Sequence, residues 1–163
     1  MVSWFESEVT TDKIKELLKD LVEGNIEEFK ESFQGLVDKT FSYFDVGENT
    51  AENFYHAFVL SLLVNLENKY KVKSNRESGE GRPDVLIIPE DKTKKGVVME
   101  FKTVKSGENE VLKKKAEEAL KQIDGMNYTH ELIDSGIKEV VELALVFYRK
   151  KTFVKYNIRK LTS

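Results

Sequence analysis

The chain of 163 residues contains no cysteine and only two prolines. Without cysteine it can form neither disulfides nor thiolate metal sites, so histidine and the carboxylates are its remaining strong metal ligands. The same absence is natural in a reducing compartment, and we expect a cytoplasmic protein. The longest apolar stretch, near Phe58, is interrupted at Ser61 and stops at Val64, well short of a membrane span. No signal-peptide pattern opens the sequence, and we expect no membrane association.

An excess of positive charge is also lacking. The formal net charge is -3, so nothing in the overall composition attracts a polyanion, and nucleic acid would have to bind through local basic surface. Two basic stretches are available, although each taken alone is more often a solvated face. They consist of Lys113, Lys114, Lys115 and Lys121, and of Arg149, Lys150, Lys151, Lys155, Arg159 and Lys160.

The N-terminal part of the sequence has helical periodicity. Apolar residues recur at helical spacing from Thr10 or Thr11 onward, and Gly24 supplies a stop. A second helix is predicted from Asn25, which can cap it, and a third over about residues 50–68. We expect the first part of the chain, residues 1–45, to be a helical extension packed on the core that follows.

Extended segments follow these helices, with one further helix between them. The run from Val85 to Ile88 is continuously apolar, so its strand should be buried on both faces. The order of elements predicts a single α/β domain, whose core has a central mixed sheet of four to five strands flanked by helices. The predicted strands are 70–75, 84–88, 97–104, 140–148 and 152–158, the helix covers about 110–126, and the core as a whole covers 46–163.

Three charged residues of the predicted sheet can form a catalytic centre. Asp84 begins a buried strand directly after Pro83, at a strand end where the sheet opens to ligands. Glu100 and Lys102 lie on the next strand and, being two positions apart, project from the same face. A turn between the two strands allows a hairpin that brings Asp84 and Glu100 together.

Two carboxylates that close repel each other unless a proton or a cation lies between them. Hard oxygen ligands without sulfur favour Mg²⁺ or Mn²⁺, and Mg²⁺ is commonly held by one or two carboxylates together with substrate phosphate. Lys102 could then orient a water for attack at phosphorus. Each part also has a simpler interpretation, because an acid-x-Lys triplet is commonly an ion pair on a strand and Pro-Asp commonly marks a turn. The combination in this order favours the catalytic interpretation.

Pro83-Asp84 followed by Glu100-Phe101-Lys102 resembles the signature of the PD-(D/E)xK nuclease superfamily. The resemblance extends over nearly the whole chain and is weakest at the N-terminal end. It implies a restriction-endonuclease-like core. Three further features are similar to the branch that is often found at the C-terminus of prokaryotic AAA-ATPase-like proteins: the stretch from Ser74 to Asp84, Tyr55-His56, and Gln122 with Tyr128.

The resemblance implies roles for the central residues. Asp84 and Glu100 would bind Mg²⁺ or Mn²⁺ with the main-chain carbonyl of Phe101, and Lys102 would serve the attacking water. Glu52 matches a catalytic acid that the superfamily often places on its first core helix, where it can hold a second metal ion or a metal-bound water. The spacing of Asn49 and Glu52 is equally that of a capping box.

Five residues are candidates for contacts with substrate: Gln122, Tyr128, Arg76, Arg82 and His56. Three of them have an alternative role. Gln122 can be a helix-surface residue, Arg76 can pair with Glu77, and His56 is more typical of a hydrogen-bonded core histidine.

The function implied by the resemblance is metal-dependent hydrolysis of phosphodiester bonds in nucleic acid, with DNA as the expected substrate. The rival interpretation is a non-catalytic or regulatory module of the same fold that docks onto an ATPase or another partner. The chain has no P-loop motif of its own, so it can be a fragment of a longer ATPase-containing protein. A homodimer is compatible with the sequence, which shows no self-complementary patch.

Overall fold

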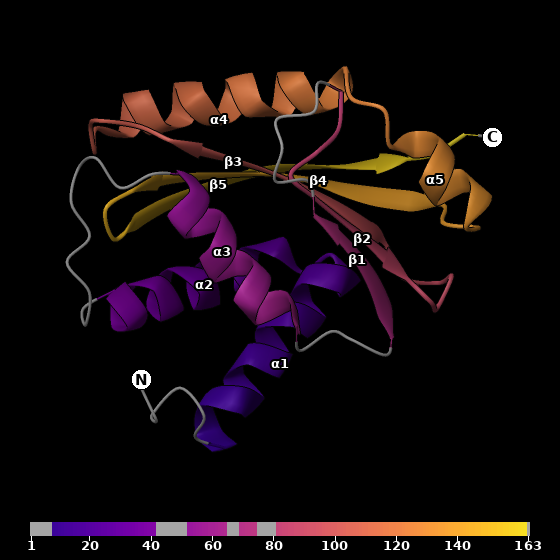
Figure 1. Cartoon of the computed structure of the whole chain (residues 1–163), viewed down its shortest axis with the longest axis horizontal. Coiled ribbons are helices and arrows are strands. Elements are labelled where there is room, and N and C mark those ends of the chain that lie inside the picture. Colours follow the sequence, from indigo (N-terminus) through magenta and orange to yellow (C-terminus); the bar gives the residue numbers. More distant parts are fainter. Residues whose placement is uncertain (1–7, 42–51, 65–68, 75–80, 163) are drawn as a thin grey trace.

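The computed structural model describes residues 8–41, 52–64, 69–74 and 81–162 (Figure 1). The chain begins with the helices α1 (Glu8–Glu23), α2 (Ile26–Phe41) and α3 (Glu52–Leu63). Helix α1 ends at Gly24, whose φ of 85° lies in the left-handed region that glycine adopts without a steric penalty. The next residue, Asn25, starts α2 by accepting a hydrogen bond from the Phe29 N–H through its main-chain carbonyl, with N···O 3.1 Å.

In the described part of the chain, five strands form one mixed sheet. Their spatial order follows the sequence, and only β3 and β4 are parallel neighbours. The crossover between these two strands contains α4 (Asn109–Asp124) and the short α5 (Thr129–Asp134). The strands are β1 (Tyr70–Ser74), β2 (Val85–Pro89), β3 (Gly96–Thr103), β4 (Glu139–Tyr148) and β5 (Lys151–Lys160).

The sheet separates two layers of helices. Helices α1, α2 and α3 cover one face, and α4 and α5 cover the other (Figure 1). Alternate residues of each strand enter the two cores, as the pleat requires. On β3, Met99 and Phe101 pack with the N-terminal helices, whereas Val98 packs with Leu112 and Ala116 of α4. A face-to-face stack of Tyr55 on Phe147, with ring centroids 4.3 Å apart, fastens α3 to the sheet.

The predicted α/β fold with a mixed sheet flanked by helices is therefore confirmed. Strand β2 is buried along its whole length, as its apolar run predicted, although β3 occupies the middle of the sheet. Helix α3 ends at Leu63, inside the predicted 50–68, and residues 65–68 lie outside the described residues. Helix α5 was not predicted, because six residues are too few to establish a helical period. None of the described helices combines the length and the apolar character needed to cross a membrane.

Candidate active site

The β2–β3 hairpin brings Asp84 and Glu100 together. Val85 lies opposite Met99 in the antiparallel register, so Asp84, directly before β2, adjoins Glu100. The main chain fixes both carboxylates. The Phe101 N–H donates to Asp84 Oδ2 at 2.8 Å, and the Asp84 N–H lies 3.4 Å from Glu100 Oε1. One hairpin thus brings together Asp84 and Glu100, which are 16 positions apart in the sequence, on the sheet face covered by α4.

The Glu100 carboxyl group is in an environment that disfavours its charge. The residue is only 7% exposed. Burial, followed by the negative charge of Asp84, raises the pKa of Glu100 to about 7, and a hydrogen bond with the Asp84 carboxyl acts in the same direction. The charge of Lys102 lowers this pKa but does not offset the rise. Near neutral pH the pair therefore needs either a retained proton or a cation.

Lys102 lies on the same face of β3 as Glu100, at the margin of the carboxylate pair. Its Nζ is 3.6 Å from Glu100 Oε2, and its side chain is 23% exposed. A separation of 3.6 Å is a loose ion pair without the short contact of a charge-assisted hydrogen bond. The ammonium group thus stays available to a molecule that approaches from solvent.

Glu52 joins this group of charges from α3, on which it is the first residue. Although the residue as a whole is exposed, partial burial of its carboxyl group raises the pKa of Glu52. The charge of Lys102 lowers that pKa, the charge of Asp84 raises it, and a hydrogen bond from the Thr103 N–H lowers it. These effects show that the Glu52 carboxyl group lies within electrostatic range of Asp84 and Lys102. The predicted capping partner, Asn49, lies outside the described residues.

The paired carboxylates fit a hard divalent cation. Their ligand atoms are all oxygen, and the raised pKa of Glu100 indicates that Lys102 does not fully neutralise this acid beside Asp84. Among the described residues, no three histidine or acidic side chains gather into a complete metal cage. Mg²⁺ and Mn²⁺ are usually held by one or two carboxylates and completed by water and phosphate.

Two predicted substrate-binding residues are engaged elsewhere in the structure. His56 is buried with its ring edge-on to Phe101 at 5.1 Å and its Nε2 3.1 Å from Ser74 Oγ, so it approaches β3 from the face opposite Glu100. Tyr128 is 2% exposed, and its hydroxyl donates a hydrogen bond to Glu142. The structure brings neither side chain to the carboxylate pair.

The other predicted substrate-binding residues lie on the surface. Gln122 is exposed in the last turn of α4. Arg82 is exposed two positions before Asp84 and lines a cavity with Pro83 and Leu86. Arg76 lies outside the described residues.

Sequence reasoning missed two features near this site. Lys115 of α4, noted only as part of a basic stretch, lowers the pKa of Glu52 and is therefore close to it. Glu142 is an acid buried on β4, and its one sequence signal was its position in an otherwise apolar strand.

A family model described as the PD-(D/E)XK nuclease superfamily matches residues 50–157. The match covers more than half of the chain and includes every described residue of the site. The protein belongs to the PD-(D/E)XK nuclease superfamily, as its signature residues predicted. No curated protein matches the chain.

Proposed function

We propose that the protein hydrolyses phosphodiester bonds in DNA with the help of Mg²⁺ or Mn²⁺. The observation that carries this proposal is the pair formed by Asp84 and Glu100. A buried Glu100 beside a partly buried Asp84 has no structural advantage of its own, because the negative charge of Asp84 raises the free energy of ionising Glu100. Lys102 lies beside them, and the three residues form a triad. The match to the PD-(D/E)XK nuclease superfamily supports a catalytic role for this triad.

Each residue of the triad has a distinct task. Asp84 and Glu100 provide carboxylate oxygens for the ion, with the Phe101 carbonyl as a further ligand. When bound, the ion supplies Lewis-acid activation of water and offsets charge that develops on the phosphate oxygens. Lys102 holds the attacking water at the solvent side of the pair. Glu52, whose carboxylate lies within range of the Lys102 charge, orients that ammonium group.

Basic residues at the same end of the sheet support a polyanionic substrate. Strands β3 and β4 end together, with Thr103 opposite Phe147, and the β4–β5 hairpin follows directly. Its residue Lys151 donates hydrogen bonds to Gly107 O at 2.9 Å and to Asn109 Oδ1 at 3.0 Å, which places the hairpin beside the loop that leaves β3. The hairpin therefore presents positive charge near the triad despite the overall charge of -3.

We assign contacts with substrate phosphate to Arg82 and Gln122, both of which are exposed. Arg76, which lies outside the described residues, stays a prediction from the sequence. His56 and Tyr128 are given no contact with substrate at the carboxylate pair, because their side chains are engaged elsewhere. An ATPase partner and a homodimer stay predictions from the sequence.

The test is a cleavage assay on supercoiled, linear and single-stranded DNA, and on RNA, with Mg²⁺ or Mn²⁺ and with chelator. Asp84→Asn keeps an acceptor for the Phe101 N–H, and Lys102→Met keeps the apolar stem, so both should fold normally. Both should lose at least roughly 100-fold in rate, because each removes a group of the reacting centre. Lys138→Gln removes an exposed charge at the opposite end of the sheet and serves as the matched control.

Cleavage at the parental rate by both triad variants would contradict the proposal. Cleavage of RNA but not DNA would support the proposed hydrolysis and show that the substrate is RNA.

A further inference from the structure

A small cavity lies beside the catalytic pair on the same face of the sheet. We propose that it binds the phosphate next to the scissile one in the strand that is cleaved. This inference rests on the proposed function and adds to it a second phosphate site. Residues from β1, the turn before β2, β2 itself and the segment from Asn127 into α5 line the cavity, whose volume is about 100 Å³. Its lining residues include Lys73, Arg82, Leu86, Asn127, Tyr128 and Glu131.

The register of the sheet sets the distance between the two sites. Leu86, on the floor of the cavity, is two residues beyond Asp84 on the same face of β2. Two residues along a strand span about 7 Å. Successive phosphates of an extended nucleic-acid strand are separated by a similar distance. A strand whose scissile phosphate lies at Asp84 and Glu100 can therefore place its neighbouring phosphate over Leu86.

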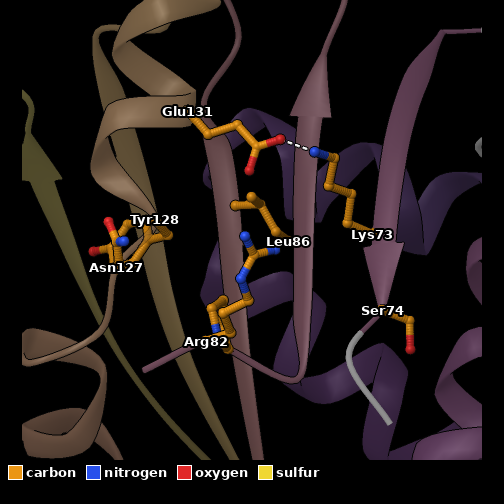
Figure 2. A pocket seen from close by; sticks show the side chains of 8 residues that line it. Lys73, Ser74, Arg82, Leu86, Asn127, Tyr128 and Glu131 are labelled. Atoms are coloured by element: carbon orange, nitrogen blue, oxygen red, sulfur yellow. Dashed lines mark hydrogen bonds and ion pairs between the residues drawn. The ribbon is translucent and has the colours of Figure 1, made fainter. Parts of the chain in front are cut away.

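The main chain holds the two sides of the cavity together. The Asn127 N–H donates to the Gly81 carbonyl at 2.6 Å, so the segment after α4 is tied to the turn that carries Arg82. Gly81 has a φ of 88°, which a residue with a side chain adopts only with strain. The Arg82 side chain extends beside Leu86, below the ion pair of Lys73 with Glu131 (Figure 2).

The charges of the lining favour an anion. Lys73 and Glu131 neutralise each other in their ion pair, so among the described lining residues Arg82 is the charge that no other lining residue balances. Among the described residues, neither the Arg82 guanidinium nor the Asn127 amide group has a hydrogen-bond or ion-pair partner. A guanidinium matches the oxygens of a phosphodiester, and the Asn127 amide group in the same lining can add a donor.

A nucleobase fits this cavity less well. Bases bound without pairing are held largely by stacking on exposed aromatic rings. Tyr128 is the aromatic residue among the described lining residues, and it is 2% exposed with its hydroxyl bonded to Glu142. The cavity thus offers a base no face on which to stack.

The experiment couples a protein variant with a change in one phosphate. A DNA substrate of defined cleavage position carries a single neutral methylphosphonate, moved one position at a time to either side of the scissile bond. At one adjacent position the parental protein should lose roughly 10- to 100-fold in kcat/KM, the loss expected for a charge-assisted contact. Arg82→Gln should lose a similar factor on unmodified DNA and lose little more when the methylphosphonate occupies that position. Arg82→Lys should recover part of the loss.

Lys138→Gln is the matched control, since it removes one positive charge from the far end of the sheet. Its effect should multiply with that of the methylphosphonate at every position. If the Arg82→Gln and methylphosphonate losses also multiply at every position, the guanidinium does not contact a flanking phosphate and the inference is wrong.

A binding version separates this inference from the proposed function. Dissociation constants of the same oligonucleotides are measured with the Asp84→Asn protein and with Asp84→Asn combined with Arg82→Gln. Coupling between Arg82 and one phosphate in these constants, without any cleavage by the parental protein, would keep the phosphate site and refute hydrolysis. Cleavage by the parental protein without coupling in either measurement would keep hydrolysis and overturn the phosphate site.

Discussion

Glu100 and Glu142 are two acids buried on the same face of the sheet, on neighbouring parallel strands, yet their surroundings differ. Glu100 lies opposite Ala144, and Glu142 lies two residues earlier on β4, opposite Val98. Glu142 is 1% exposed and accepts hydrogen bonds from the Tyr128 hydroxyl and from Arg159 Nη2, the latter at 3.1 Å. Glu100 adjoins another acid, and its cationic neighbour is 3.6 Å away.

The comparison separates a carboxylate whose charge the protein itself balances from one that, in the proposed function, binds a metal ion. The protein itself supplies Glu142 with a hydrogen-bond donor and a positive charge, which is the condition under which a buried charge is tolerated. Glu100 has only a long contact from the Asp84 N–H, at 3.4 Å, and a loose ion pair with Lys102, at 3.6 Å. These do not offset its burial and the negative charge of Asp84, so the pKa of Glu100 is raised to about 7. Burial alone does not indicate function. A buried acid whose partners are missing or of the same sign does.

The largest expected difference between the two acids is in catalysis. Glu100→Gln keeps the size of the side chain but removes a ligand charge, so cleavage should fall roughly 100- to 1000-fold. Glu142→Gln should stay within a few-fold of the parental rate at temperatures where it is folded, because its amide oxygen can still accept from Tyr128. The measurement is kcat under saturating Mg²⁺ for both variants. Equal losses would show that Glu142 belongs to the active site and would remove the contrast.

The next effect is on the free energy of unfolding. Here the replacement of Glu142 should have a larger effect than the replacement of Glu100. Glu142→Ala leaves the Tyr128 hydroxyl and the Arg159 charge without their acceptor, so the free energy of unfolding should fall by roughly 2 to 3 kcal/mol. Tyr128→Phe removes the hydrogen bond that the hydroxyl donates to Glu142 and the one that it accepts from Arg159 Nη2 at 2.7 Å, and should lose about 1 to 2 kcal/mol. Denaturant unfolding with chelator present measures both, with Glu100→Gln as the comparison. Unchanged stability in Glu142→Ala would refute its structural role.

The contrast also explains which parts of the site the sequence could predict. Asp84 and Glu100 meet through a single antiparallel hairpin, and strand periodicity together with one short turn determines which face each residue occupies. The partners of Glu142 come from β5 and from the segment between α4 and α5. Their meeting depends on how α4 crosses the sheet and on the β4–β5 register, which no local pattern encodes. The cavity beside Asp84 was missed for the same reason, since three separate segments of the chain form it.

The next effect is the pH dependence of stability that the raised pKa of Glu100 produces in metal-free protein. The folded state keeps this proton up to about pH 7, whereas the unfolded chain releases it near 4.5, the usual value for glutamate. Between these values the folded state binds more protons, so stability falls as the pH rises through this window. Between pH 5 and pH 8 the loss should be roughly 2 to 3 kcal/mol, and Glu100→Gln should lack it.

Thermal unfolding from pH 5 to 8 with chelator measures this slope, and saturating Mg²⁺ should restore stability at the upper end for the parental protein alone. Identical pH profiles for the parental protein and Glu100→Gln would show that the carboxylate pair is not electrostatically strained. Glu142→Gln serves as the control with a buried acid removed elsewhere.

The smallest effect concerns the link between the two regions. The Gly81 carbonyl accepts the Asn127 N–H, so the turn before Asp84 is joined to the segment that carries Tyr128. A Cβ at Gly81 would meet no atom within 4 Å, but its φ of 88° is strained for any other residue. Gly81→Ala should therefore lower stability by about 1 kcal/mol through backbone strain alone. Gly81→Asn should lose less, because asparagine adopts this conformation more readily. If a shift of the turn relieves the strain, kcat/KM should fall further in Gly81→Ala than in Gly81→Asn. The hydrogen bond between Tyr128 and Glu142 should stay intact in both variants. This result would show that the surroundings of Asp84 change more easily than those of Glu142.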